Sequence, residues 1–349
     1  MKKIAIVAQG LNDGGAERVA SILANYLSGR GYKLVFIAAY KDVVEYKLNE
    51  KIKIEFIHTS KRTNIERLAD RNLQILKIIK REKIDKVISF ITNEVILTEL
   101  VGVPTIHTLR NDPERVDNGF VMRNFRNIAY RLADHVVFQT QGARDYFSSA
   151  IQKKSSIIAN PMLTSKLPKW DKNSTSKTFI TACRLNEQKN LPMLIKAFKG
   201  FHIKHDDFTL EIYGEGELRE QLESLIVEVD GQEYIRLMGR SNQIYSLMQN
   251  AYAFVLSSNY EGLSNSMLEA LAIGVPCICT DCPPGGARTY ITDGINGLLT
   301  PVGDQDALEN AMEKLASDKA FCCTLSDKAT VIRDRIEHDK VCALWEQLL

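Results

Sequence analysis

The sequence lacks the features that mark several classes of protein. No apolar run approaches the roughly 18–20 residues that a membrane-spanning helix needs. The short apolar stretch near the start ends in a glycine-rich turn, so we interpret it as a first strand and not as a signal peptide. Seven cysteines among 349 residues are few and odd in number. They disfavour a disulfide framework and favour a reducing, cytoplasmic compartment.

The composition is globular, but the charge is unevenly distributed. Hydrophobic residues make up 45% and charged residues 25%, which excludes general disorder. The net charge is +2, yet residues 1–170 contain 28 Lys and Arg against 17 Asp and Glu, and the remainder contains 17 against 26. This favours an anionic partner for the N-terminal half, such as a membrane surface or a phosphate-bearing acceptor. Solvated faces of long helices explain the excess equally well, for example in the basic stretch 64–86.

Short apolar runs separated by helical periodicity indicate two parallel sheets. The runs lie at 4–8, 33–39, 86–91 and 135–140, and then at 178–182, 208–213, 234–238, 252–257 and 275–280. Such alternation is typical of parallel sheets covered by helices on both faces. The polar, proline-containing stretch 160–177 is typical of a linker. The sequence therefore predicts an α/β protein with two doubly wound domains that face each other across a cleft.

Gly14 and Gly15 lie where the first strand is expected to turn into a helix. Backbone N–H groups at such a turn can face an anion, although a plain tight turn explains the glycines about as well. The G-x-G-x-x-G fingerprint of dinucleotide-binding domains is absent, which disfavours a Rossmann dehydrogenase.

A pair of carboxylates flanks the segment YEGLSNSMLE at 260–269. Glu261 is expected in the loop at the carboxyl end of a strand, and Glu269 in the helix that follows. N–H groups between them can bind a diphosphate or sugar hydroxyls, because ligands of open α/β sheets bind at this edge. Two unrelated surface glutamates would be the default interpretation of the pair taken alone.

Two cations follow the first predicted strand of the second domain. Arg184 can bind a diphosphate through a bidentate fork, and Lys189 can act as a point charge. Further along, Gly285 and Gly286 predict another turn from a strand into a helix.

These motifs occur in a fixed order along nearly the whole chain. They are Gly14-Gly15-Ala16-Glu17-Arg18, Asn160-Pro161, Arg184 with Lys189, Glu261 with Glu269, and DGINGLL at 293–299. Together they resemble glycosyltransferase family 4. The resemblance implies a GT-B fold of two Rossmann-like domains. It also implies transfer with retention of anomeric configuration, without a metal or any cofactor beyond the nucleotide sugar.

The resemblance also assigns the domains. Residues 1–165 would bind the acceptor and be completed by a C-terminal helix at 332–349, and residues 166–331 would bind the nucleotide sugar. By position, Arg184 and Lys189 would neutralise the leaving diphosphate, and Glu261 would contact the donor sugar. Glu269 would accept hydrogen bonds from the ribose. The remaining implied contacts are Gly262, Leu263, Ser264 and Asn265 for phosphates or sugar, Gly239 and Arg240 for the base, and Gly14 and Gly15 for the acceptor or a phosphate.

The sequence departs from the family pattern near two of these positions. Ala182 and Cys183 precede Arg184 where many members have glycine. Many members also carry a histidine after the strand that follows Pro104, whereas here Arg110 holds that place and His107 falls inside the strand. We favour Arg110 as the active-site residue, because a histidine within a strand is more often part of the core.

This Arg-Asn form resembles a subgroup that builds bacterial surface polysaccharides such as capsule, O-antigen or exopolysaccharide. It implies transfer of a hexose or N-acetylhexosamine from a UDP-sugar, for example UDP-N-acetylgalactosamine, to a saccharide or a polyprenyl-diphosphate-linked saccharide. We expect a cytoplasmic enzyme, peripheral at the inner face of the plasma membrane, with no nucleic-acid partner. The alternatives are a non-catalytic GT-B subunit that stabilises a partner transferase, and a GT-B sugar-nucleotide epimerase.

Two further motifs have simpler interpretations. Asp304-Gln305-Asp306 matches the D-x-D of metal-dependent transferases, but helix capping by Asp304 explains it better. Cys279 and Cys282 have the spacing of half a zinc site, and no second ligand pair accompanies them.

Overall fold

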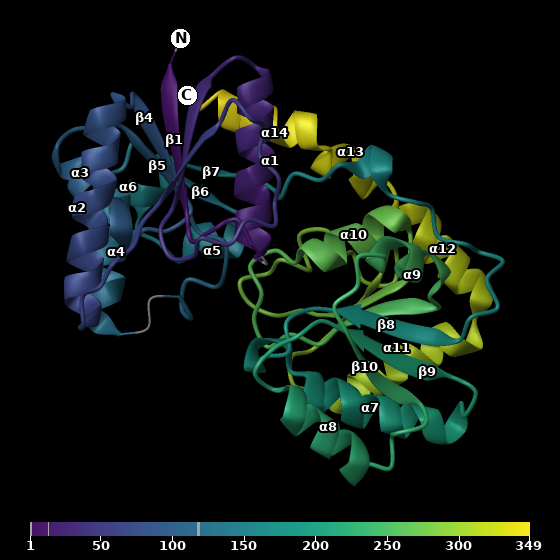
Figure 1. The fold of residues 1–349 in the computed structure, drawn as a ribbon. Coiled ribbons are helices and arrows are strands. Elements are labelled where there is room, and N and C mark those ends of the chain that lie inside the picture. The colour runs from purple at the N-terminus through teal and green to yellow at the C-terminus, as the bar shows by residue number, and fades with distance from the viewer. Residues whose placement is uncertain (1, 13, 117–118) are drawn as a thin grey trace. The chain divides into compact units, whose positions relative to one another are not determined.

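The structure is a computed structural model that describes residues 2–12, 14–116 and 119–349, and it divides into two compact units (Figure 1). Unit 1 comprises residues 1–162 together with 336–349, and unit 2 comprises residues 163–335. The division after Met162 lies shortly before the expected boundary at 165/166. The chain returns to unit 1 at Ile336, slightly later than expected. Within the described ranges, none of the helices combines the length and apolarity needed to cross a bilayer.

Unit 1 is built on a parallel sheet of seven strands in the order β3-β2-β1-β4-β5-β6-β7. Helices connect the strands, and the last helix of the chain joins the unit. The elements are β1 (Lys3–Ala8), α1 (Gly15–Gly29), β2 (Lys33–Ala38), β3 (Lys53–Phe56), α2 (Asn64–Glu82), β4 (Lys86–Ser89), η1 (Asn93–Val95), α3 (Ile96–Leu100), β5 (Thr105–Thr108), α4 (Phe120–Leu132), β6 (His135–Phe138), α5 (Gln141–Asp145), α6 (Ser149–Gln152), β7 (Ser155–Ile157) and α14 (His338–Glu346).

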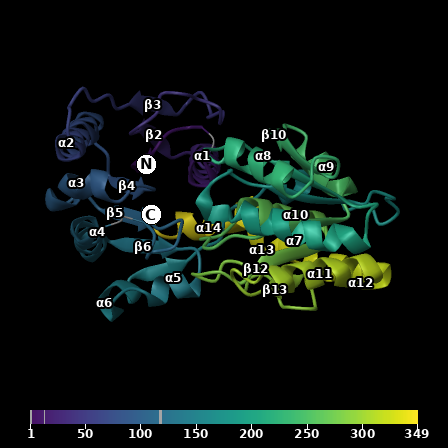
Figure 2. The same ribbon diagram turned by 90° about the horizontal axis from the view of Figure 1, so that it is seen from below.

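The alternation of side chains along β1 assigns each face of this sheet to different helices. Ile4 and Ile6 pack in a buried cluster with α1 and α14, whereas Ala5 and Val7 pack in a second cluster with α2. Successive residues of a strand point to opposite faces, so the unbroken apolar run at residues 4–8 of β1 buries both faces. Figure 2 shows the sheet strands between these helices.

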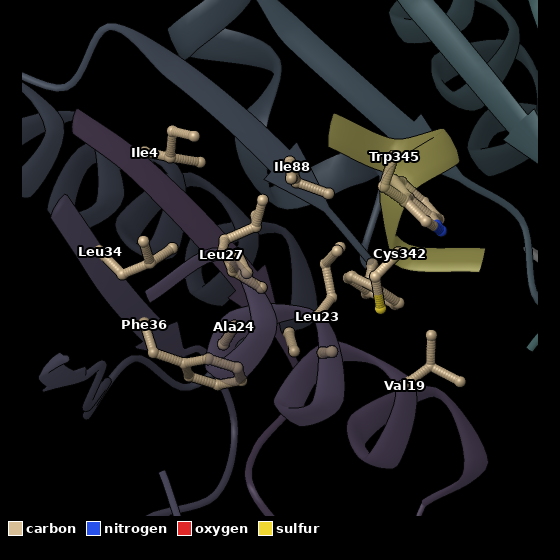
Figure 3. Packing of buried hydrophobic residues seen from close by; sticks show 14 of the residues in the cluster. Ile4, Val19, Leu23, Ala24, Leu27, Leu34, Phe36, Ile88, Cys342 and Trp345 are labelled. Atoms are coloured by element: carbon tan, nitrogen blue, oxygen red, sulfur yellow. The ribbon is translucent and has the colours of Figure 1, made fainter. Parts of the chain in front are cut away.

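The C-terminal helix α14 completes the core of unit 1 (Figure 3). Cys342 and Trp345 are fully buried among residues of α1 and the sheet, such as Leu23, Leu27 and Ile88. Trp345 also stacks on the ring of Phe90, with ring centroids 6.0 Å apart. The apolar face of α14 is therefore the face that covers unit 1.

Unit 2 contains a parallel sheet of six strands in the order β10-β9-β8-β11-β12-β13, with α7 and α8 on one face and α9 and α10 on the other (Figure 1). Its elements are η2 (Thr164–Lys166), β8 (Thr178–Ala182), η3 (Glu187–Lys189), α7 (Leu191–Lys204), β9 (Thr209–Tyr213), α8 (Arg219–Glu228), β10 (Ile235–Gly239), α9 (Ile244–Asn250), β11 (Ala253–Leu256), α10 (Asn265–Ile273), β12 (Cys277–Thr280), β13 (Leu298–Thr300), α11 (Gln305–Ser317) and α12 (Lys319–Ala329). Helix α13 (Ile332–Ile336) leads back to unit 1.

An aromatic cluster anchors α7 to the sheet of unit 2. The ring of Phe179 on β8 contacts those of Phe198 and Phe201 on α7, with centroids 5.8 and 5.3 Å apart. The rings of Phe208 and Tyr252 extend the cluster, since each contacts Phe179 and they contact each other with centroids 5.0 Å apart. Aromatic side chains bury large areas, so this contact fixes the helix that follows the Lys189 turn.

Candidate active site

The strand order of unit 2 places one pair of loops where a ligand is expected. From β8 the chain adds β9 and β10 on one side and then crosses to add β11, β12 and β13 on the other. β8 and β11 are parallel neighbours, so their carboxyl ends meet at this reversal of strand order. Ligands of open α/β sheets bind outside the strand ends at such a point. The loop after β8 contains Arg184 and Lys189, and the loop after β11 contains Glu261.

An ion pair joins these two loops. The Nζ atom of Lys189 pairs with Oε2 of Glu261, and the two side chains are 9% and 15% exposed. Burial disfavours the charged form of the lysine, but the Glu261 carboxylate outweighs this effect and raises the pKa of Lys189. Lys189 is therefore protonated at neutral pH, and its charge is held at the strand ends.

Further hydrogen bonds hold the same two loops together. The hydroxyl of Ser257 donates to the carbonyl of Lys189 at 2.8 Å. The backbone N–H of Asn259 donates to the carbonyl of Gln188 at 2.8 Å, and the Asn190 amide donates to the Asn259 side chain at 3.0 Å. Asn190 has a φ of 45°, a left-handed conformation that asparagine tolerates and that starts α7. The position of Lys189 is thus fixed by its backbone as well as by its charge.

Arg184 differs from Lys189 in its surroundings. Its side chain is exposed, and it makes no hydrogen bond or ion pair with another residue of the described chain. Its backbone carbonyl accepts from the N–H of Asn186 at 3.0 Å, which turns the loop toward η3. A guanidinium at the strand ends without a protein partner is available to an anion.

The segment from Gly262 to Asn265 forms the entrance to α10. Ser264 is the N-cap residue, and its hydroxyl accepts a hydrogen bond from the N–H of Met267 at 3.3 Å. Gly262, Leu263 and Ser264 are buried, whereas Asn265 is partly exposed. The first N–H groups of a helix lack carbonyl partners within it, so this terminus suits an anionic group.

Glu269 lies in the second turn of α10 and is almost completely buried. The hydroxyl of Tyr245 on α9 donates to its Oε1 atom at 2.8 Å. This bond orients the carboxylate, for which the family resemblance implies contact with ribose hydroxyls. The two predicted carboxylates thus differ, since Glu261 pairs with a cation and Glu269 with a phenol.

Gly239 and Arg240 end the neighbouring strand β10. Gly239 has a φ of 71°, and its carbonyl accepts a hydrogen bond from the N–H of Gly214 at 2.8 Å. Gly214 itself has a φ of 133°, and a Cβ there would collide with the carbonyl of Cys183 beside Arg184. The loops after β8, β9 and β10 therefore approach one another so closely that glycine is required at position 214. Arg240 is exposed.

The prediction that Gly285 and Gly286 lie at a turn into a helix is wrong. After β12, residues 283–290 form hydrogen-bonded turns and no helix. For example, the N–H of Ile291 donates to the carbonyl of Ala287 at 2.8 Å. Gly286 instead packs directly against the carbonyl of Gly262, where a Cβ would collide. The N–H of Glu261 donates to the carbonyl of Pro283 at 2.9 Å, so this loop supports the Glu261 segment.

In unit 1, Arg110 lies at the carboxyl end of the sheet. It follows β5, and its Nη2 atom donates to Oδ1 of Asn160, which follows β7. The amide of Gln139, just after β6, donates to the same oxygen at 2.6 Å. The guanidinium carbon also lies 5.7 Å from the centre of the Phe90 ring, in a cation–π arrangement. Three strand ends are thus joined around Arg110, which explains the Asn160-Pro161 motif structurally.

His107 lies inside β5 and is fully buried. Its Nε2 atom bonds to Glu99 on α3, and its ring lies 5.4 Å from that of Tyr130 on α4. Both contacts are with helices that cover the sheet, whereas Arg110 lies at the strand ends.

Gly14 and Gly15 lie at the start of α1, after β1, where the sheet of unit 1 reverses its strand order. Gly14 is the N-cap residue, and a Cβ there would collide with the carboxylate of Glu17. Gly15 is exposed. The first turn of α1 therefore carries its own carboxylate, beside the glycines predicted to face an anion.

The two discounted motifs have structural explanations. The Asp304 carboxylate accepts from the N–H of Ala307 at 2.9 Å and caps α11, which confirms the predicted capping role. Cys279 and Cys282 are buried, and burial raises the pKa of both thiols. Among the described residues, no group of three or more His, Cys, Asp and Glu side chains could hold a metal ion.

Several residues that shape these loops were not predicted from the sequence. Ser257 and Asn259 tie the two loops of unit 2 together, Tyr245 orients Glu269, and Gln139 shares the Asn160 oxygen with Arg110. Only Gly214 had a visible signal, because G-E-G-E follows directly after a predicted strand. The others are polar residues without a motif, and their partners lie far away along the chain.

Two parallel α/β units, with cations and a helix N-terminus gathered at the strand ends of the second, define a GT-B protein. Comparison with family models agrees. Residues 13–165 match the model for Glycosyltransferase Family 4, and residues 164–331 match the model for Glycosyl transferases group 1. The chain therefore combines a Glycosyltransferase Family 4 domain with a Glycosyl transferases group 1 domain, the make-up of a GT-B glycosyltransferase.

Three similar proteins cover most of the chain. It is 26% identical, over 94% of each chain, to the N-acetylgalactosamine-N,N'-diacetylbacillosaminyl-diphospho-undecaprenol 4-alpha-N-acetylgalactosaminyltransferase of Campylobacter jejuni. It is 24% identical, over 84% of this chain and 85% of the other, to the amylovoran biosynthesis glycosyltransferase AmsD of Erwinia amylovora. The crystal structure of Anabaena HepE in complex with UDP shares the fold, with a TM-score of 0.83 and 18% identity over 99% and 98% of the two chains.

Proposed function

We propose that this glycosyltransferase transfers a hexose or N-acetylhexosamine from a UDP-sugar to a polyprenyl-diphosphate-linked saccharide, with retention of anomeric configuration. The observation that carries the proposal is the group formed by Arg184, Lys189 and Glu261 at the switch point of unit 2. Arg184 and Lys189 can stabilise the charge of a leaving diphosphate, and Glu261 holds Lys189 in position.

In this proposal unit 2 binds the donor. Arg184 takes the diphosphate through its free guanidinium, and Lys189 adds a second positive charge that replaces a metal ion. The N-terminus of α10, from Gly262 to Asn265, receives a phosphate or sugar hydroxyls. Glu269 accepts hydrogen bonds from the ribose while Tyr245 holds its carboxylate in place. Gly239 and Arg240 contact the base of the nucleotide.

Retention follows from the same residues. The leaving diphosphate is stabilised by Arg184 and Lys189, so the acceptor hydroxyl can attack from the face that the diphosphate leaves. Glu261 is engaged by Lys189, which weakens a carboxylate as a nucleophile. It contacts the donor sugar through hydrogen bonds and does not form a covalent glycosyl intermediate, unlike the nucleophile of retaining glycosidases.

Unit 1 binds the acceptor in this proposal. Arg110 lies at the strand ends, and Gly14 and Gly15 lie at the start of α1, so these residues are the candidates for contact with the acceptor. The names of the Campylobacter and Erwinia relatives support a lipid-linked acceptor and a role in polysaccharide synthesis. The proposed place of action is the cytoplasmic face of the plasma membrane.

A nucleotide-sugar screen tests the donor assignment. Thermal unfolding of the wild-type protein is measured with UDP-N-acetylgalactosamine, UDP-N-acetylglucosamine, UDP-glucose and GDP-mannose, without added metal. A bound ligand raises the midpoint temperature of unfolding, because it stabilises the folded protein. At a ligand concentration of 100 times the dissociation constant, this stabilisation is about 2.7 kcal/mol. We expect one UDP-sugar to stabilise the protein, and Glu269→Gln to weaken that effect. No stabilisation by any UDP-sugar, or an unchanged effect in Glu269→Gln, contradicts the proposal.

A further inference from the structure

Helix α4 of unit 1 presents an apolar stripe outward. Along the helix the stripe recurs every three or four residues, and each member is exposed: Val121 62%, Phe125 41%, Ile128 46% and Leu132 47%. The spacing i, i+4, i+7 and i+11 places all four on one side of an α-helix. The face that packs on the protein is a different one, formed by Arg126, Ala129 and Tyr130. The stripe is therefore not needed to hold the helix on unit 1.

The charges of α4 are all positive. The helix contains Arg123, Arg126 and Arg131 and no Asp or Glu. Arg126 is buried and donates to the carbonyls of Pro113 and Val116 at 2.8 and 3.2 Å, so its role is structural. Arg123 and Arg131 are exposed, and within the described chain their side chains form no hydrogen bond or ion pair. At 100° per residue, Arg131 lies roughly 90° around the helix from the stripe, and Arg123 roughly 170°, on the side of Arg126 and Tyr130.

A further cation lies at the C-terminal end of α4. The ammonium of Lys154 donates to the carbonyl of Arg131 at 2.7 Å and to that of Ala133. The first acidic residue after the helix, Asp134, lies 3.6 Å from the ammonium of Lys86. The positive charge around the stripe is thus not neutralised by acids of α4 itself.

The basic helix α2 provides the contrast. Its exposed apolar residues, Ile65 and Leu73, are eight positions apart and form no stripe. Acidic side chains are interspersed along it, and Glu82 alone pairs with Lys3, Lys53 and Arg81. Helix α2 therefore carries acidic as well as basic side chains and lacks an apolar stripe.

We infer that α4 is the surface through which this protein docks on an anionic lipid bilayer. An apolar stripe on a helix whose only charged side chains are arginines on its other sides is the pattern of a helix that lies in the membrane interface. The apolar side chains enter the acyl boundary, and Arg123 and Arg131 stay among the anionic headgroups. A second copy of the chain fits less well, because two such helices would bring arginines of one sign together. The inference deepens the proposed function, since a polyprenyl-linked acceptor lies in the same bilayer.

Vesicle flotation tests the docking surface directly. The wild-type protein is mixed with vesicles of phosphatidylglycerol and phosphatidylcholine, or of phosphatidylcholine alone, at about 50 mM and about 500 mM salt. We expect binding to the anionic vesicles that weakens at high salt. The double variant Phe125→Ser/Ile128→Ser should bind about 10-fold more weakly or worse, because two apolar side chains no longer enter the lipid. Arg123→Gln/Arg131→Gln should weaken binding mainly at low salt.

The matched control is Ile65→Ser/Leu73→Ser, which removes two exposed apolar side chains from α2. This variant should bind vesicles as the wild type does. Equal binding by the α4 variant and the wild type, or no binding of the wild type, overturns the inference. A wild-type dimer that the α4 variant converts to a monomer, without vesicle binding, would show an interface between copies and also overturn it.

Activity distinguishes this inference from the proposed function. With a water-soluble saccharide acceptor, the α4 variant should transfer sugar as fast as the wild type. With a polyprenyl-linked acceptor in vesicles, its rate should fall together with its vesicle binding. Vesicle binding without any sugar transfer contradicts the proposed function but still supports α4 as the docking surface.

Discussion

Lys189 and Glu261, 72 residues apart in the sequence, form an ion pair that ties the loop after β8 to the loop after β11. The pair lies at the switch point of the unit 2 sheet, where α/β proteins bind their ligands. It is mostly shielded from water, and Arg184 stands on the same loop with no protein partner among the described residues. One cation is therefore held in place by the protein while the other remains available.

Breaking the Lys189–Glu261 pair should lower stability as well as activity. Lys189→Met leaves the Glu261 carboxylate without its cation, and we expect a loss of about 1–3 kcal/mol in the free energy of unfolding. Lys189→Met/Glu261→Gln should regain most of that stability while transfer stays abolished. Urea denaturation of both single variants and the double variant measures the coupling, alongside a transfer assay. If the double variant loses as much stability as the two single variants together, the pair contributes nothing to stability.

Arg184→Ala should separate activity from stability. The side chain is exposed and without a described partner, so the free energy of unfolding should change by less than about 0.5 kcal/mol. Transfer should fall by about 100-fold or more, because a group that stabilises the leaving diphosphate is gone. Arg236→Ala, which removes an exposed arginine from β10 of the same unit, is the control and should leave both quantities unchanged. A normal transfer rate in Arg184→Ala would show that Arg184 is not part of the active site.

Arg110 and His107 should give opposite results. His107→Ala leaves the buried Glu99 carboxylate without its partner, so we expect it to destabilise the protein by about 3–5 kcal/mol. Arg110→Ala should cost less stability, about 1–2 kcal/mol through the lost hydrogen bond to Asn160, and it should lower the rate of transfer. Circular dichroism melts and initial rates decide between them. A stable, inactive His107→Ala protein would instead point to the histidine as the functional residue.

Acid should weaken a network of unit 1 that contains Glu82. Hydrogen bonds from Lys3 and Lys53 lower the pKa of the Glu82 carboxyl from 4.5 to about 2. The carboxyl is deprotonated more readily in the folded protein, so its contribution to stability is fully present above pH 4.5. It is lost as the pH falls from there toward 2. Glu82→Gln should therefore lower the melting temperature at neutral pH and have progressively less effect in acid. A pH-independent difference would show that its charge is not responsible.

Trp345→Ala tests the return of the chain to unit 1. The indole is fully buried against α1 and Phe90, and its removal should cost about 3–5 kcal/mol through the cavity it leaves. Trp345→Phe should cost clearly less. Chemical denaturation measures both, and near-wild-type stability of Trp345→Ala would mean that α14 is not required for the core.

Much of the fold could be predicted because its signals are local. The runs at 4–8 and 33–39 are apolar at nearly every position, as strands buried on both faces must be, and they form β1 and β2. The edge strand β7 is only three residues long and partly exposed, and β3 and β13 lie at sheet edges too. Short edge strands carry little apolar pattern, so the sequence does not reveal them.

The sequence by itself determined the α/β class, the order of the motifs and the residue types that suit a diphosphate. These follow from periodicity and from chemistry that each short segment carries alone. Only the tertiary structure decided which residues meet. It paired Lys189 with Glu261, left Arg184 exposed, joined Arg110 to Asn160, and buried His107 against Glu99. The reason is that strand order brings together loops far apart in the chain, and contacts at that range leave no mark in local sequence.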